Sequence, residues 1–265
     1  MALPVLPLNR CGCPAWFIAS RDFNRNPRPL EIQGVRRAHR SLFERLDAMK
    51  APLSRERCFR HYMKMLYLSG KWREGVTYSE RRSLRNDYMR FLRGWIHDTN
   101  MEEGAVLKGW VESRLGLPPV YHGGLIERPG CGEHLLYLKQ RMRETARSNA
   151  IESQFDLIYE YVQYELARRH PGVSTFRLYR GIRNIRDYIF LDETIDHRSV
   201  VRMNNLNSFS GRLEYAWEFG NHVFEVNVPA YKIFFRADLL PGVLPKGEDE
   251  SLVIGGDFDV TVRSF

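Results

Sequence analysis

Two glutamates spaced two residues apart, Glu248 and Glu250, stand directly before an apolar segment near the C-terminus, Ser251-Leu252-Val253-Ile254. The apolar segment predicts a β-strand, and residues i and i+2 of an extended chain project from the same face. Both carboxylates can therefore enter one cleft. Such a pair suits chemistry at a sugar carbon, where one carboxylate stabilises positive charge and the other moves a proton. The alternative is a solvated acidic turn that precedes a strand.

An arginine followed by a glycine, Arg180-Gly181, ends a predicted strand at residues 176–181. An arginine at the end of a strand can bind a phosphate through two parallel N–H donors. The glycine beside it lets a ligand approach the backbone closely, because glycine has no Cβ atom. The alternative is a surface arginine beside an ordinary turn.

Two serines flank a phenylalanine in the segment Ser208-Phe209-Ser210. If this segment is extended, the two hydroxyls share one face and Phe209 projects from the other. A helix is predicted directly afterwards, at residues 211–219, so Ser210 could instead be its N-cap. A ligand-binding role for Ser208 and a capping role for Ser210 are compatible.

The three motifs lie in a β-rich C-terminal region that follows a helical N-terminal region. Up to residue 172, after an irregular lead-in at 1–30, apolar residues recur every three or four positions and predict helices. These helices are expected near 31–49, with Pro52 as the stop, and near 58–70, 78–97, 133–147 and 151–169. Strands are expected near 176–181, 199–203, 223–228, 232–236, 251–254 and 258–262. Because helices precede strands instead of alternating with them, we predict an α+β fold, with residues 1–172 mainly helical and residues 173–265 a β-rich core, joined in one compact unit.

The overall composition narrows the classes of partner. The 265 residues carry a net charge of +8, but the arginines are interleaved with acidic and apolar residues, which argues against a nucleic-acid-binding protein. The histidines and the cysteines, Cys11, Cys13, Cys58 and Cys131, lack the spacing of a metal site, so no metal is expected. No apolar run reaches the ~20 residues that span a bilayer, and no signal sequence is recognisable, so we predict a cytoplasmic protein without a membrane span.

The order of an arginine, a Ser-x-Ser motif and a Glu-x-Glu motif resembles the Arg-Ser-Glu class of mono-ADP-ribosyltransferases. The long helical N-terminal region, Tyr179-Arg180-Gly181, Asn207-Ser208-Phe209-Ser210, Tyr215-Ala216-Trp217-Glu218-Phe219-Gly220 and Gly247-Glu248-Asp249-Glu250 together resemble the dinitrogenase reductase ADP-ribosyltransferases over the whole chain. The resemblance implies a split β-sandwich core that binds NAD as a substrate. No Rossmann fingerprint is needed for NAD in such a core.

The resemblance also implies roles for four NAD-binding residues. Arg180 would hold a phosphate of NAD, and the backbone of Gly181 would bind the nicotinamide carboxamide. Ser208 would orient the nicotinamide ribose and support the catalytic glutamate. Ser210 would be the fourth NAD-binding residue.

For the two glutamates, the resemblance implies separate tasks. Glu250 would be the catalytic glutamate, which binds the ribose 2′-hydroxyl and stabilises the oxocarbenium-like state. Glu248 would bind the guanidinium of an acceptor arginine and assist its deprotonation.

The implied acceptor is an arginine of the nitrogenase iron protein, whose modification inactivates it and so regulates nitrogen fixation. A PII-type signalling protein is the implied regulator. Two alternatives stay open at this point: an arginine ADP-ribosyltransferase with another protein target, and a non-catalytic basic binding module.

Overall fold

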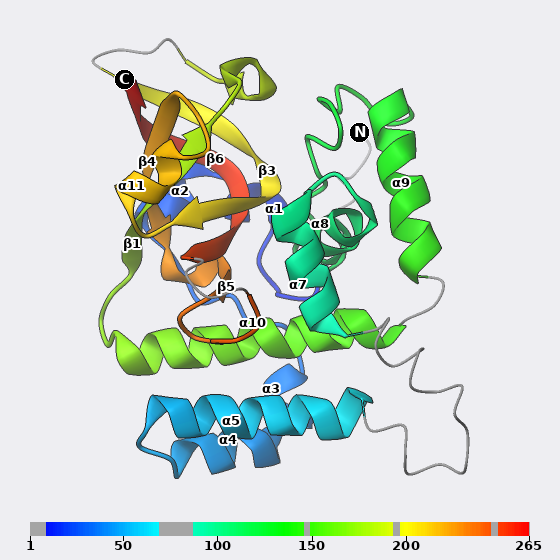
Figure 1. The fold of residues 1–265 in the computed structure, drawn as a ribbon, viewed down its shortest axis with the longest axis vertical. Coiled ribbons are helices and arrows are strands. Elements are labelled where there is room, and N and C mark those ends of the chain that lie inside the picture. The colour runs from blue at the N-terminus through cyan, green and yellow to red at the C-terminus, as the bar shows by residue number, and fades with distance from the viewer. Residues whose placement is uncertain (1–8, 69–86, 146–148, 193–196, 245–248, 265) are drawn as a thin grey trace, which may run out of the picture.

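The computed structural model describes residues 9–68, 87–145, 149–192, 197–244 and 249–264. Within these residues the long helices come first and the strands follow, which confirms the predicted α+β fold (Figure 1). The sheet lies above helix α10 (Asn149–Arg169) in this view, and a second group of helices stands beside the sheet. No helix in the described part of the chain is long and apolar enough to cross a membrane.

The helical region consists of short helices at its start and longer ones later. Their bounds are α1 Ala15–Ile18, α2 Arg21–Arg25, α3 Val35–Ala38, α4 Arg40–Asp47, α5 Pro52–Met63 with a π-helical extension η1 Lys64–Leu68, α7 Tyr88–His97, α8 Glu102–Leu115, α9 Gly132–Thr145 and α10 Asn149–Arg169. The sequence pattern predicts Pro52 as the end of a helix, whereas Pro52 is the first residue of α5. A proline is tolerated there because the first N–H of a helix has no intrahelical acceptor.

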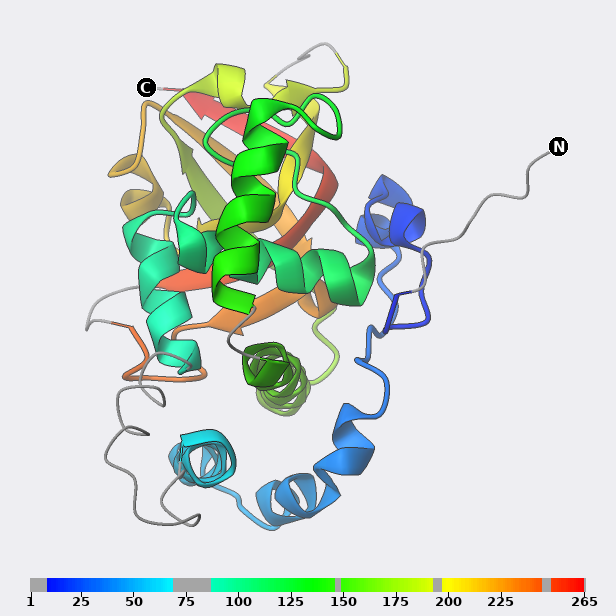
Figure 2. The same cartoon turned by 90° about the vertical axis from the view of Figure 1, so that its right-hand side faces the viewer.

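Helices α4 and α5 form a layer on the side of α10 that faces away from the sheet (Figure 2). A buried ion pair joins this layer to α10: the Arg55 guanidinium donates to both carboxylate oxygens of Glu165, at 2.5 and 2.9 Å. Both side chains are almost fully buried, so the charge of Arg55 needs Glu165 for compensation, whereas Glu165 also pairs with Arg169. On the other face of α10, the Tyr159 hydroxyl donates to the Tyr231 carbonyl oxygen, and the Gln163 side-chain amide donates to the Ile233 carbonyl oxygen.

The described strands form one antiparallel sheet that wraps around its own core. The strands are β1 Thr175–Ile182, β2 Ile189–Phe190, β3 Arg198–Ser210, β4 His222–Pro229, β5 Ile233–Arg236 and β6 Glu250–Ser264, with the short helices η3 Ile185–Asp187, α11 Leu213–Trp217 and η4 Ala230–Lys232 between them. Their order is β2-β3-β1-β4-β6-β5, and β3 also pairs with β6, so β3, β1, β4 and β6 close into a ring, with β2 attached to β3 and β5 attached to β6. The predicted strands at 251–254 and 258–262 are a single strand, and the serine motif belongs to β3.

A bulge interrupts the antiparallel pairing of β3 with β6. The register of β3 shifts between Met203 and Leu206, opposite Gly255 and Gly256. A Cβ atom on Gly255 would lie 1.6 Å from a carbonyl oxygen of β3, so only glycine fits there. Such bulges increase the local twist and redirect the strand that follows. Beyond the bulge, the register places the serine motif opposite the first residues of β6.

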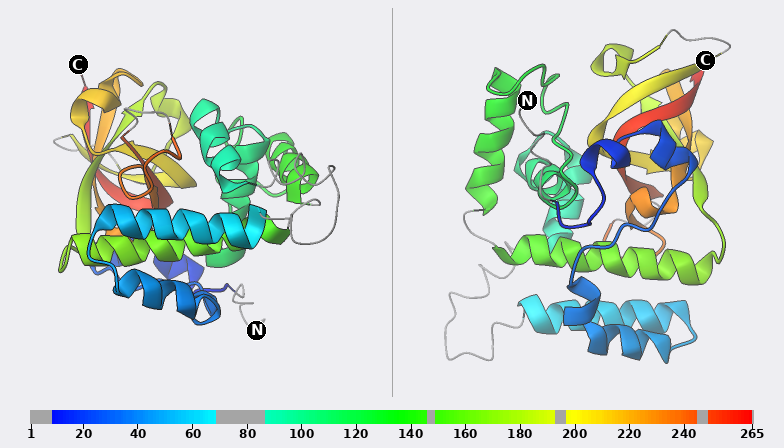
Figure 3. Two further views of the ribbon diagram at one scale, coloured as in Figure 1. Left: turned by 60° about the horizontal axis from the view of Figure 1, so that its bottom comes forward. Right: turned by 180° about the vertical axis from the view of Figure 1, so that it is seen from behind.

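Helices α1 and α2 pack against the sheet, as Figure 3 shows from behind. The backbone N–H of Asp257 donates to the Ala19 carbonyl oxygen at 2.7 Å, and the side-chain amide of Asn24 donates to the Asp257 carbonyl oxygen at 2.8 Å. The sequence predicts an irregular segment here. The two helices have only four and five residues, which is too short for a periodic apolar pattern to be recognised.

Candidate active site

A cavity of about 670 Å³ opens between the C-terminal end of α7 and the strands that carry the sequence motifs. This volume is in the range of small-molecule sites. Its lining comes from four places in the chain: Trp95, Ile96, His97, Asp98 and Thr99; Tyr179, Arg180 and Gly181; Ser208, Phe209, Ser210, Tyr215, Ala216, Glu218 and Phe219; Asp249 and Glu250. Five of the six residues predicted for the site therefore meet in one cavity.

Ser208 is the residue at which the site converges. Its hydroxyl donates to Glu250 Oε1 at 2.5 Å and accepts the indole N–H of Trp95 at 2.8 Å. Its backbone carbonyl accepts from the Arg180 guanidinium at 2.7 Å. The contacts reach Ser208 from β6, α7 and β1, so one serine on β3 ties three other elements together.

Arg180 lines the cavity and is held by two hydrogen bonds. Its Nε donates to the hydroxyl of Tyr188 at 2.7 Å, and one terminal nitrogen donates to Ser208. Tyr188 follows η3, and its ring packs edge-on against Phe224. A guanidinium has five N–H donors. Within the described part of the chain, the other donors of Arg180 have no acceptor, so they can bind an anionic ligand.

Glu250 is the first residue of β6 and stands opposite Ser210 in the register. Diagonal neighbours on paired antiparallel strands are within side-chain reach, which explains the contact between Glu250 and Ser208. Glu248 lies outside the described residues, so the predicted shared face of the two glutamates stays a prediction. Asp249 is anchored on the serine motif: its Oδ2 accepts from the Ser210 hydroxyl at 3.1 Å and from the Gly211 N–H at 3.0 Å.

The burial of the serine motif alternates as predicted: Phe209 is buried, whereas Ser208 and Ser210 are partly exposed. Ser210 does not cap α11, whose N-cap residue is Arg212; its hydroxyl accepts the Arg212 backbone N–H at 3.0 Å and thereby shapes the turn before the helix.

Gly181 lies on the cavity wall where α11 crosses β1. A Cβ atom there would lie 2.0 Å from the Ala216 carbonyl oxygen. The glycine is therefore required by the packing of α11, in addition to any ligand that it admits.

The sequence pattern places Trp95 only on the apolar stripe of its helix. The side chain is buried as expected, with 1% exposure, but its N–H reaches across to Ser208. A buried tryptophan N–H needs an acceptor, and this requirement is the signal in the sequence from which a polar partner for Trp95 could be predicted. The aromatic residues Tyr215 and Phe219 also lie on the cavity wall, where the sequence pattern assigns them no individual role, and Phe219 is 60% exposed.

Behind Trp95 lies a buried basic residue, Lys108. Its ammonium group donates to the Tyr121 carbonyl oxygen at 3.0 Å and approaches His122 Nδ1 at 3.1 Å. Burial lowers the pKa of Lys108 to about 7, and the positive charge of Arg180 adds to this effect, while Asp98 opposes it. Burial and the neighbouring Lys108 lower the pKa of His122 to about 4.

Metal ligands do not gather in the described part of the chain, where no group of three or more His, Cys, Asp or Glu side chains could hold an ion. The four cysteines are free thiols. At the cavity, a carboxylate, a serine hydroxyl and a guanidinium meet from neighbouring strands.

Comparison with known proteins identifies the family of this chain. The family described as "Dinitrogenase reductase ADP-ribosyltransferase (DRAT)" matches residues 8–262. A Rhodospirillum rubrum protein named NAD(+)--dinitrogen-reductase ADP-D-ribosyltransferase is 40% identical over 255 residues, which cover 94% of this chain and 92% of the relative. The comparison with solved structures gave no match. The chain belongs to the dinitrogenase reductase ADP-ribosyltransferase family.

Proposed function

We propose that this protein transfers ADP-ribose from NAD to an arginine of dinitrogenase reductase, the nitrogenase iron protein, and that this modification inactivates the target and regulates nitrogen fixation. The observation that carries the proposal is the convergence of Arg180 and Glu250 on Ser208 within one cavity. The substrate and target also agree with the name of the Rhodospirillum rubrum relative.

NAD binding is assigned to residues on β1 and β3. The Arg180 guanidinium would bind a phosphate oxygen with the donors that its protein contacts leave available. The backbone of Gly181 would bind the carboxamide of the nicotinamide. Ser208 and Ser210 would face the nicotinamide ribose, since both line the cavity.

Glu250 is assigned to the bond that breaks. When the bond between ribose C1′ and the nicotinamide nitrogen breaks, its electron pair leaves with nicotinamide and positive charge develops on the ribose. A carboxylate in a cavity with little water stabilises that charge more strongly than it would in bulk solvent. The hydroxyl of Ser208 holds one carboxylate oxygen of Glu250, which fixes the direction in which the carboxylate faces.

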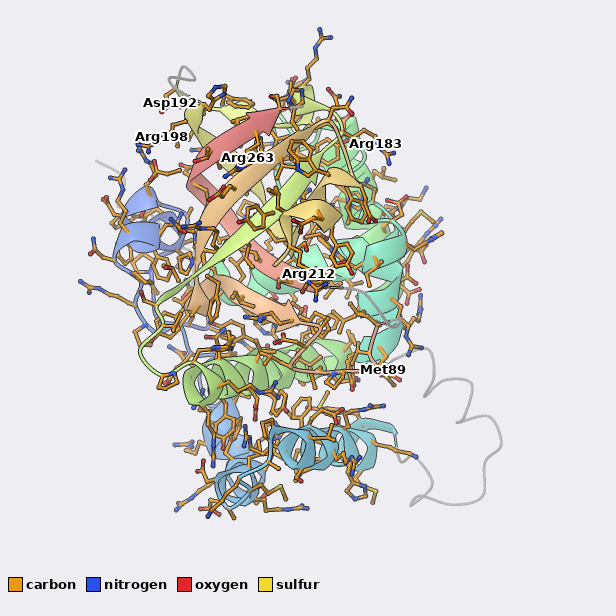
Figure 4. All side chains as sticks on the ribbon, turned by 60° about the vertical axis from the view of Figure 1, so that its left-hand side comes forward. Met89, Arg183, Asp192, Arg198, Arg212 and Arg263 are labelled. Atoms are coloured by element: carbon orange, nitrogen blue, oxygen red, sulfur yellow. The ribbon has the colours of Figure 1, made fainter. Side chains whose placement is uncertain are left out.

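The acceptor arginine then forms a bond from a guanidinium nitrogen to C1′ and loses one proton. A guanidinium is a poor nucleophile because it stays protonated. Glu248 is assigned to pair with it and to accept the proton late in the reaction. Arg183 and Arg212, both labelled in Figure 4, are exposed and follow the cavity-lining residues Gly181 and Ser210 by two positions each, which favours a target with an acidic surface around the acceptor.

The test is incubation of the protein with purified dinitrogenase reductase and NAD labelled on its adenylate part. We expect label on one arginine of the target and release of one nicotinamide per label. Glu250→Gln should abolish labelling while the protein still binds NAD. Absence of both labelling and nicotinamide release with the wild-type protein would refute the proposal.

The same assay separates the alternatives. Nicotinamide release with label on other proteins, but none on dinitrogenase reductase, would favour an arginine ADP-ribosyltransferase with another target. Absence of any NAD cleavage would favour a non-catalytic binding module. Control by a PII-type signalling protein and a cytoplasmic location stay predictions from the sequence.

A further inference from the structure

The hydroxyl of Ser208 has a single proton, and its two neighbours decide where that proton points. The indole nitrogen of Trp95 can only donate, so Ser208 Oγ must accept from it. The proton of Ser208 is then available for Glu250 Oε1. Without the indole N–H, the hydroxyl would keep its contact to Glu250 but would lose the partner that fixes its oxygen.

Trp95 is suited to this task because its own position is tightly restricted. The side chain has 1% exposure, and the Lys108 ammonium lies 6.0 Å from the centre of its ring. Helix α7 is also tied to its surroundings: the Arg90 guanidinium bonds to Glu103 and to Glu144. A donor on so constrained a helix holds its acceptor in one place.

The same helix also holds the segment that leads to the glutamates. Arg93 Nε donates to the Val243 carbonyl oxygen at 2.7 Å. Helix α5 contributes a second contact, from the Arg60 guanidinium to the Pro241 carbonyl oxygen at 3.2 Å. The helical region thus contacts the site both at Ser208 and in the segment between β5 and β6.

We propose that Trp95 is a positioning residue for the transfer reaction, which acts through the Ser208 hydroxyl on the carboxylate of Glu250. This inference rests on the proposed function, because it assigns Trp95 to the reaction of that same site. Trp95 would not bind the reacting atoms; it would hold the serine that orients the catalytic carboxylate.

The first test is Trp95→Phe, which removes the N–H and keeps an aromatic ring. Loss of one hydrogen bond that acts mainly in the transition state should lower kcat about tenfold and change KM for NAD by less than about threefold. The matched control is Trp110→Phe. Trp110 is also fully buried and donates its indole N–H to a carboxylate, that of Asp156 at 2.7 Å, but it lies outside the cavity lining.

A double-mutant cycle decides whether Trp95 acts through Ser208. Once Ser208→Ala has removed the acceptor, adding Trp95→Phe should cost little further kcat. If Trp95→Phe does not fold, incorporation of benzothienylalanine at position 95 replaces the N–H by sulfur and preserves the shape of the ring system. Equal losses in Trp95→Phe and Trp110→Phe, or additive losses in the cycle, would overturn the proposal.

A spectroscopic readout is independent of activity. In a nitrogen–proton correlation spectrum, Ser208→Ala should move the indole N–H resonance of Trp95 and leave that of Trp110 in place. If the resonance moves but the wild-type protein does not cleave NAD, the hydrogen bond exists and the proposed function fails. If the wild-type protein is active and the resonance does not move, the role of Trp95 fails on its own.

Discussion

Removal of the Arg180 side chain is the most direct test of how the cavity binds NAD. Arg180→Ala deletes the guanidinium that lines the cavity and contacts both Tyr188 and Ser208. Its donors that lack an acceptor within the described residues are the ones assigned to a phosphate of NAD. The variant should therefore weaken NAD binding more than it slows the chemical step.

The magnitude follows from the number of contacts that the guanidinium can offer. A hydrogen bond between charged partners contributes about 1.5–3 kcal/mol. One or two such bonds to phosphate correspond to about 3 kcal/mol, which raises the Kd of NAD about 100-fold. Arg180→Lys should lie between the wild type and the alanine variant, because an ammonium keeps the charge and loses the fork of parallel donors.

Isothermal titration calorimetry with NAD is the suitable assay, with thermal unfolding as a check on the fold. Arg177→Ala is the matched control: Arg177 lies on the same strand, its side chain is 66% exposed, and it pairs with Glu225 at 3.4 Å outside the cavity. This control removes the same charge and should leave Kd almost unchanged. A Kd for Arg180→Ala within about threefold of the wild type, in a folded protein, would remove Arg180 from the NAD site.

Three further changes test the packing at Gly181, the anchoring of Asp249 and the titration of the buried Lys232. Gly181→Ala should lower the free energy of unfolding by about 1–3 kcal/mol, because the added Cβ would lie 2.0 Å from a carbonyl oxygen. The control is Gly132→Ala, whose Cβ would meet nothing within 4 Å and which should change the free energy of unfolding by less than about 0.5 kcal/mol. Urea unfolding compares the two variants. Asp249→Ala should lower kcat more than NAD affinity, because the Asp249 carboxylate anchors the chain beside Glu250 by accepting from the Ser210 hydroxyl and the Gly211 N–H. Steady-state kinetics equal to those of the wild type would contradict this. Burial lowers the pKa of Lys232 to about 7 from its ordinary 10.5, so the unfolded chain binds more protons between these values and stability should rise with pH there. Lys232→Met should reduce that slope by up to about 1.4 kcal/mol per pH unit in urea titrations, and equal slopes would show that Lys232 does not titrate in this window.

Much of the fold could be predicted because helices and strands differ in the period of their apolar residues. The periodic segments that became α7 and α10 and the alternating ones that became β1 and β4 were all recognised. The predicted element boundaries were wrong where one residue type is compatible with two local structures. Pro52 can follow a helix or begin one, and the glycines at 255 and 256 can end a strand or form a bulge within it.

The sequence by itself determined the identity and order of Arg180, the serine motif and Glu250, and the face of the strand on which the serines lie. Strand alternation is a local property, so it can be read without the fold. The tertiary structure decided which partners these residues have. Trp95 meets Ser208 across 113 positions of sequence, and Asp249 meets Ser210 across 39, and no local period encodes such contacts. They depend on how helices pack on a twisted, bulged sheet, which fixes the distances within the site.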